Sequence, residues 1–189
     1  MDSFPAIIAS EKGAPATLGE VPESALPEGD VTVDVHWSSL NYKDGLAVTG
    51  RGPVIRSFPM VCGIDLAGTV HDSDSADWSP GDEVVVTGWG LSETHPGGYT
   101  TRQRVRAQWL QGRPEGLSLR DTMAIGTGGL TAMLCLMALE EVGARAAFVR
   151  INAVPLAKGT EIMDPRGHCE KVSVKQRAKN RRVPYERQA

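Results

Sequence analysis

Cysteine, aromatic side chains and long apolar runs are all scarce in this chain of 189 residues, of which only 5% are aromatic. The three cysteines, Cys62, Cys135 and Cys169, are scattered and odd in number, which indicates reduced thiols rather than a disulfide framework. No run of about eighteen apolar residues occurs, so the sequence predicts no membrane-spanning segment. The opening residues, MDSFPAIIAS, lack a basic region before an apolar core, so we expect no secretory signal and a cytoplasmic location.

The usual signatures of metal and phosphate sites are missing as well. The four histidines show no paired spacing, and no C-x-x-C occurs, so we expect no metal. A search for G-x-G-x-x-G and for the P-loop pattern finds neither. A dinucleotide would therefore lack its main pyrophosphate anchor at a helix N-terminus within this chain.

Glycine and proline are plentiful, at 21 and 12 residues, which favours many short strands joined by turns. Apolar residues alternate with polar ones from Val31 to Trp37, and a longer apolar run from Met60 to His71 is interrupted by glycines. Further strands are expected at 83–86 and 99–107, the second with three arginines on one solvated face. The sequence thus predicts a mainly β fold, a small and partly open barrel.

One amphipathic helix is expected near the end of this region. Apolar residues fall at helical spacing, namely Leu130, Met133, Leu134, Met137 and Ala138, and Gly143 stands where a C-cap is expected. The segment 118–125 leads into it through Gly126–Thr127–Gly128–Gly129, so we expect a kinked helix.

The charge changes sign near position 150. Residues 1–150 hold 11 Lys and Arg against 19 Asp and Glu, whereas residues 151–189 hold 9 against 4. Residues 144–189 lack an apolar period, so we expect a basic tail that is disordered or arises from a frameshift. The tail could contact nucleic-acid phosphates, but it has no interleaved aromatics apart from Tyr185, so we expect no nucleic-acid partner.

The segment from Ser39 to Val70, SLNYKDGLAVTGRGPVIRSFPMVCGIDLAGTV, resembles the catalytic domain of zinc-free medium-chain dehydrogenases/reductases, in the acryloyl-CoA reductase and quinone oxidoreductase branch. The resemblance covers Ser3 to about Val142. It implies a GroES-like catalytic domain at 1–117, a connecting helix at 118–143 that would lead into a Rossmann domain, NADPH as cofactor, and homo-oligomeric intact relatives. That nucleotide-binding domain is expected to be missing from this chain.

Zinc-dependent members of the same superfamily place Cys, His and acidic ligands where this chain has NYKD at 41–44 and GID at 63–65. Asparagine and isoleucine cannot replace the thiolate and imidazole that a catalytic zinc prefers. The implied chemistry is therefore hydride addition to an activated double bond or a quinone, with the protein placing the partners and supplying donors to the developing oxyanion.

The resemblance implies roles for three residues, each with a structural alternative. Tyr42 would place its hydroxyl near the nicotinamide riboside and phosphate, or else pack on Trp37. Thr127 would face the nicotinamide carboxamide, or else be an ordinary helix-kink threonine. Asn41 is the catalytic candidate, an uncharged amide beside a transient negative charge, or else the cap of a helix begun by Tyr42. Asp44 reads as a first-turn residue with a structural role.

Two functions remain open at this point. The chain is either the N-terminal part of an NADPH-dependent oxidoreductase acting on an acryloyl-CoA-type or quinone substrate, or a catalytically inactive remnant that retains only the folded barrel. Reading the downstream DNA in the other frames separates them, because an out-of-frame G-x-G-x-x-G segment would favour the remnant.

The purified chain is expected to contain no zinc, and chelators should not lower its melting temperature, because the ligand types are wrong. Elemental analysis checks this, and about one zinc per chain would refute the zinc-free assignment.

Overall fold

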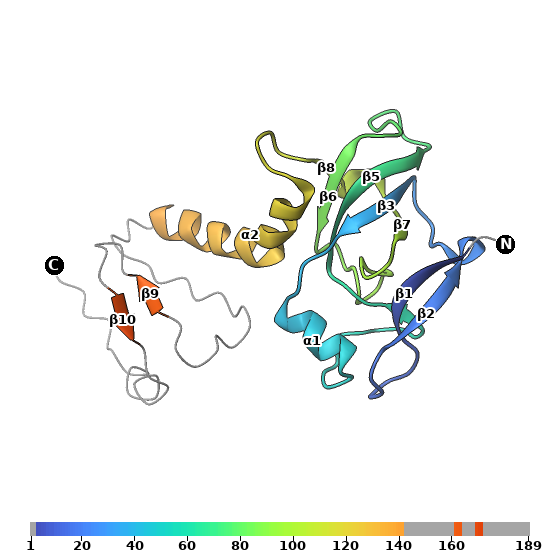
Figure 1. Cartoon of the computed structure of the whole chain (residues 1–189), viewed down its shortest axis with the longest axis horizontal. Coiled ribbons are helices and arrows are strands. Elements are labelled where there is room, and N and C mark those ends of the chain that lie inside the picture. Colours follow the sequence, from blue (N-terminus) through green and yellow to red (C-terminus); the bar gives the residue numbers. More distant parts are fainter. Residues whose placement is uncertain (1–2, 142–160, 164–168, 172–189) are drawn as a thin grey trace. The chain divides into compact units, whose positions relative to one another are not determined.

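The structure, a computed structural model, describes residues 3–141, 161–163 and 169–171. Two antiparallel sheets and two helices make up the first of these ranges (Figure 1). The strands are β1 (Ser3–Ala9), β2 (Thr17–Pro22), β3 (Val31–Trp37), β4 (Met60–Val61), β5 (Asp65–Ser73), β6 (Glu83–Thr87), β7 (Arg102–Val105) and β8 (Gln111–Gly112). The helices are α1 (Tyr42–Val48) and α2 (Leu119–Glu141), with 3-10 turns at Glu23–Ala25 and Ala107–Trp109.

The larger sheet has the order β7-β3-β5-β6-β8 and the smaller one the order β2-β1-β4. The larger sheet surrounds the main core, whose buried side chains are mostly branched aliphatics: Val31, Val33, Leu66, Val70, Val84, Val86, Leu91 and Val105, with Trp109 and Leu110. A second buried cluster forms under α1 from Ala9, Ala47, Val54 and Cys62. The expectation of a mainly β, partly open barrel followed by a kinked helix is confirmed.

The apolar run from Met60 to His71 does not form one strand. It divides into β4 and β5, and Gly63 between them has a φ of 99°. Tyr99 donates its backbone N–H to the carbonyl of Cys62 at 2.8 Å, so this turn is filled from across the barrel. A residue other than glycine would not fit this turn, because a Cβ at position 63 would lie 2.6 Å from the Tyr99 ring.

The strand expected at 99–107 is shorter than predicted, since β7 covers only Arg102–Val105. Its arginine face is only partly solvated: Arg102 is half-buried and pairs with Asp34 and Glu23, while Arg106 is exposed. The pKa of Asp34 is lowered by its hydrogen bonds and charge pairing with Arg102 and His71, which outweigh the opposing effect of burial.

Helix α2 is bent at Gly126, whose φ of 49° and ψ of −160° are not helical. This confirms the kink expected at the glycine run. Beyond the kink the large apolar side chains stay exposed, namely Leu130, Met133, Leu134, Leu136 and Met137. By length and composition alone, Leu119–Ala138 could span a membrane, although the presence of one such helix is weak support for that.

The expected basic tail at 144–189 lies outside the described residues, except for two short strands. These are β9 (Glu161–Met163) and β10 (Cys169–Lys171), which pair antiparallel in a second compact unit spanning Val154–Ala189. The sequence pattern predicted no strand in this part of the chain.

Glycine at position 68 is required by the close approach of two strands. Gly68 in β5 pairs with Val35 in β3, and a Cβ at Gly68 would lie 2.0 Å from the carbonyl oxygen of Asp34. The overlap cannot be relieved by rotating a side chain, because the obstructing atom belongs to the main chain of β3.

We therefore expect Gly68→Ala to lower the free energy of unfolding by about 3 kcal/mol, the upper range for an overpacked core. The control is Gly112→Ala in β8, where a Cβ meets nothing within 4 Å; we expect its effect to stay within about 0.5 kcal/mol. Urea denaturation of both variants measures this, and equal midpoints would contradict the close-packing argument.

Candidate functional site

Of the three residues that the sequence singled out, Asn41 and Thr127 lie against one buried carboxylate, Asp65. Asn41 is the N-cap of α1, and Tyr42 is the first residue of that helix. Thr127 directly follows the bend of α2 at Gly126. Asp65 begins β5 and has no exposed surface.

Asp65 accepts hydrogen bonds from both sides of the site. Thr127 donates its backbone N–H to Asp65 Oδ2 at 2.9 Å and its hydroxyl to Oδ1 at 2.5 Å. Ser39 also donates its hydroxyl to Oδ2, and the Asn41 amide nitrogen lies 3.3 Å from the same oxygen. The hydroxyl of Ser38 donates to the backbone carbonyl of Asp65 at 2.7 Å. The carboxylate thus joins the segment before α1 to the bend of α2.

A second buried carboxylate, Asp44, fastens the start of α1. Its Oδ2 accepts the backbone N–H of Asn41 at 2.8 Å, which completes a capping box. Its Oδ1 accepts the backbone N–H of Ile64 at 2.9 Å. Burial raises the pKa of Asp44, its hydrogen bonds to Asn41 and Ile64 act in the opposite direction, and the nearby Asp65 charge raises it further.

Asn41 lies between these two carboxylates. Its amide nitrogen donates to Ser39 Oγ at 2.7 Å and to Asp44 Oδ2 at 3.1 Å, with Asp65 Oδ2 slightly farther away. An amide has two N–H hydrogens, so both are used inside the protein. Of the two interpretations left open by the sequence, this geometry favours the cap.

Tyr42 differs from these residues because it is 67% exposed. The structural alternative for Tyr42 is packing on Trp37, whose ring lies under the guanidinium of Arg120, 5.9 Å from the ring centroid. Lys43 is engaged in an ion pair with Glu93. The Tyr42 phenol is therefore the surface-facing donor of this helix start.

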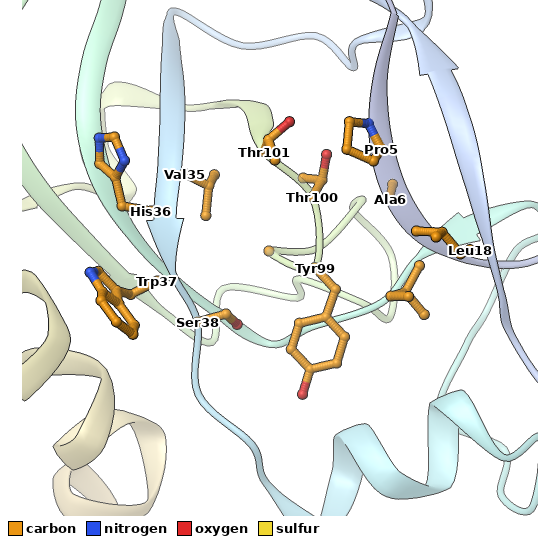
Figure 2. Close-up of a pocket in the computed structure, with 12 residues that line it drawn as sticks. Pro5, Ala6, Leu18, Val35, His36, Trp37, Ser38, Tyr99, Thr100 and Thr101 are labelled. Carbon is orange, nitrogen blue, oxygen red and sulfur yellow. The ribbon is translucent and has the colours of Figure 1, made fainter.

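A pocket of about 330 Å³ opens beside the site, between β1, β2 and the end of β3 (Figure 2). Its lining is mostly apolar, and Tyr99, one of the lining residues, donates its hydroxyl to the Ser39 carbonyl at 3.0 Å. Burial is the largest cause of the raised pKa of Tyr99, and the nearby Asp44 charge adds to it. The pocket is not lined by Asn41, Tyr42 or Thr127, so it adjoins their cluster rather than containing it.

Among the residues that the structure describes, no three His, Cys, Asp or Glu side chains are grouped so that they could hold a metal ion. Cys62, close to the site in sequence, is fully buried, and burial raises the pKa of its thiol to about 11. A thiol in that state is a poor ligand and a poor nucleophile.

Sequence reasoning missed Asp65 and Ser39. The only signal for Asp65 was a single acidic residue inside an apolar run, which is unusual because a buried carboxylate requires partners. The sequence gives no sign that those partners come from Thr127, 62 residues further along the chain.

A family model described as the alcohol dehydrogenase GroES-like domain matches residues 27–158. The chain is 58% identical over 130 residues to "Probable acrylyl-CoA reductase AcuI" of Escherichia coli, covering 69% of this chain and 40% of that protein. It thus spans about two fifths of the length of that curated relative.

Solved structures of related proteins are likewise matched over less than half of their length. Escherichia coli YhdH with bound NADPH has a TM-score of 0.71 at 52% identity, covering 76% of this chain and 44% of that one. The quinone oxidoreductase from Coxiella burnetii has a TM-score of 0.61 at 26% identity, covering 74% of this chain and 46% of that one.

Asp44→Asn should destabilise the fold by about 1–3 kcal/mol, because the new amide cannot accept hydrogen bonds at both of its former oxygens. One of the two buried N–H groups, of Asn41 or Ile64, would lose its partner. The control is Asp72→Asn at an exposed position of β5. Thermal and urea unfolding measure both, and an Asp44 variant as stable as the control would contradict the structural role.

Proposed function

Because this chain belongs to the alcohol dehydrogenase GroES-like domain family, we propose that it is the catalytic-domain part of an NADPH-dependent oxidoreductase. Its substrate would be an activated double bond of the acryloyl-CoA type, or a quinone. The observation that supports this most directly is that Asp65 holds Thr127 by both its backbone N–H and its hydroxyl, in a chain 52% identical to an NADPH-bound structure.

The chemistry of the cluster fits a nicotinamide cofactor. Thr127 is half-buried, and its hydroxyl proton is used by Asp65, so toward a ligand the oxygen can only accept. A carboxamide N–H₂ group is a donor of that complementary kind. When bound, the cofactor supplies the hydride.

Tyr42 supplies a hydrogen-bond donor for the cofactor, whereas Thr127 supplies an acceptor. Its hydroxyl is exposed at the start of α1, where it can donate to a ribose or phosphate oxygen. Asn41 acts as a positioning residue in this proposal, since both of its amide hydrogens already hold Ser39 and Asp44. Donors to the developing oxyanion of the substrate must then come from groups other than Asn41 and Thr127.

Binding the phosphates of the nucleotide requires protein groups beyond those described above. The sequence contains neither phosphate-loop pattern, and relatives extend well beyond the part matched here. We propose that reduction requires a nucleotide-binding domain in addition, and that the exposed apolar residues of α2 mark the helix leading to it. The location proposed is cytoplasmic, with neither membrane nor nucleic acid as partner, and the intact relatives are expected to be homo-oligomeric.

NADPH should produce little or no shift in the melting temperature of the 189-residue chain, because most of the cofactor's binding surface would be lacking. Joining residues 1–142 to the nucleotide-binding domain of an intact relative should restore reduction of acryloyl-CoA or a quinone. Robust NADPH oxidation by the unfused chain would contradict this division of the site, and an inactive but folded fusion would count against the proposed function.

In the active fusion, Tyr42→Phe should raise the Michaelis constant for NADPH by about fivefold to tenfold, the effect of losing one hydrogen bond. Thr49→Val is the matched control, since it removes a hydroxyl at the other end of α1 that donates to Gly45. Steady-state kinetics at varied NADPH checks this. If both variants behave alike, Tyr42 does not contact the cofactor.

A further inference from the structure

Every side-chain donor around Asp65 points into the protein. The hydroxyls of Ser39 and Thr127 each donate their single hydrogen to the carboxylate, and the Asn41 amide is fully used between its neighbours. A carboxylate can only accept, so each of these two hydroxyls points its hydrogen at Asp65. The groups that remain available on Ser39, Asn41 and Thr127 are lone pairs.

Asp65 itself is held rigidly. Asp65 is completely buried, and it pairs with Thr87 where β5 runs beside β6. Its backbone carbonyl accepts a hydrogen bond from the Ser38 hydroxyl. The bend of α2 fits closely against it: a Cβ at Gly126 would lie 2.9 Å from Asp65 Oδ2 and 3.0 Å from Ser39 Cβ. The carboxylate therefore determines both where Thr127 lies and which way its hydroxyl points.

We propose that Asp65 is a positioning residue that makes Thr127 a hydrogen-bond acceptor and thereby selects a cofactor carrying a carboxamide N–H₂ donor. The inference rests on the proposed function and adds to it a residue and a basis for ligand selectivity. A cofactor whose carboxamide is replaced by an acetyl group offers only an acceptor, so it would bring two oxygens together at Thr127.

Asp65→Asn reverses this polarity. The new amide can donate to the Thr127 oxygen, which frees the hydroxyl proton to face the ligand. The amide oxygen, at the former place of Oδ2, can still accept the Thr127 backbone N–H, so loss of that hydrogen bond is tested with Asp65→Ala, which removes both oxygens. The matched control is Thr131→Val, because Thr131 lies one turn along α2 and its hydroxyl donates only to the Thr127 carbonyl.

The first measurement uses the 189-residue chain and needs no cofactor. Amide hydrogen exchange should show the Thr127 N–H protected in the parent chain and in Thr131→Val, and its protection should fall about tenfold or more in Asp65→Ala, which lacks both carboxylate oxygens. The amides of β5 and β6 report whether the variant stays folded. Unchanged protection at Thr127 in a folded Asp65→Ala chain would overturn the proposal.

The second measurement compares dissociation constants of NADPH and its 3-acetylpyridine analogue in the two-domain fusion. Binding is used because the reduction potentials of the two cofactors differ, which would alter turnover. The parent fusion and Thr131→Val should prefer NADPH by roughly tenfold, and Asp65→Asn should lose that preference.

The two measurements separate the possible failures. A fusion that binds neither cofactor would refute the proposed function and the selectivity with it, whereas the exchange data would still show whether Asp65 holds Thr127. Loss of protection at Thr127 in Asp65→Ala, together with an unchanged NADPH preference in Asp65→Asn, would show a purely structural carboxylate and overturn the selectivity.

Discussion

A carboxylate without solvent contact has to be satisfied by donors from its surroundings, and much of this site follows from how Asp65 meets that requirement. Desolvating a carboxylate costs several kcal/mol, and charge-assisted hydrogen bonds from well-placed donors offset it. Here the donors come from the segment before α1 and from the bend of α2. Satisfying Asp65 therefore holds together two parts of the chain that the strand pairing of the barrel does not join.

The second carboxylate increases this constraint. Asp44 is also fully buried, and the Asn41 amide lies within hydrogen-bonding distance of both acids. Like charges this close oppose each other, which is one reason the pKa of Asp44 is raised. Each acid accepts hydrogen bonds from backbone N–H groups, so moving either carboxylate would leave those N–H groups without a partner. The start of α1, the start of β5 and the bend of α2 are thus fixed together.

Part of this arrangement could be predicted from the sequence. The glycine run at 126–129 predicted the bend, and the position of Asn41 before Tyr42 predicted a helix cap, because both depend on local backbone chemistry. The division of the 60–71 run into two strands could not be predicted from the local pattern, because the turn at Gly63 pairs with Tyr99, a residue distant in the sequence. The role of Asp65 was equally hidden, because its donors meet it only in the folded chain.

The central claim is that Asp65 leaves Thr127 as an acceptor for the cofactor's carboxamide. A crystal structure of the two-domain fusion with NADPH, at a resolution sufficient to assign the amide from its hydrogen-bond partners, tests it most directly. The account predicts the carboxamide nitrogen within about 3 Å of Thr127 Oγ1, with both Thr127 donors still on Asp65. A carboxamide oxygen facing Thr127, or a hydroxyl turned away from Asp65, would contradict it.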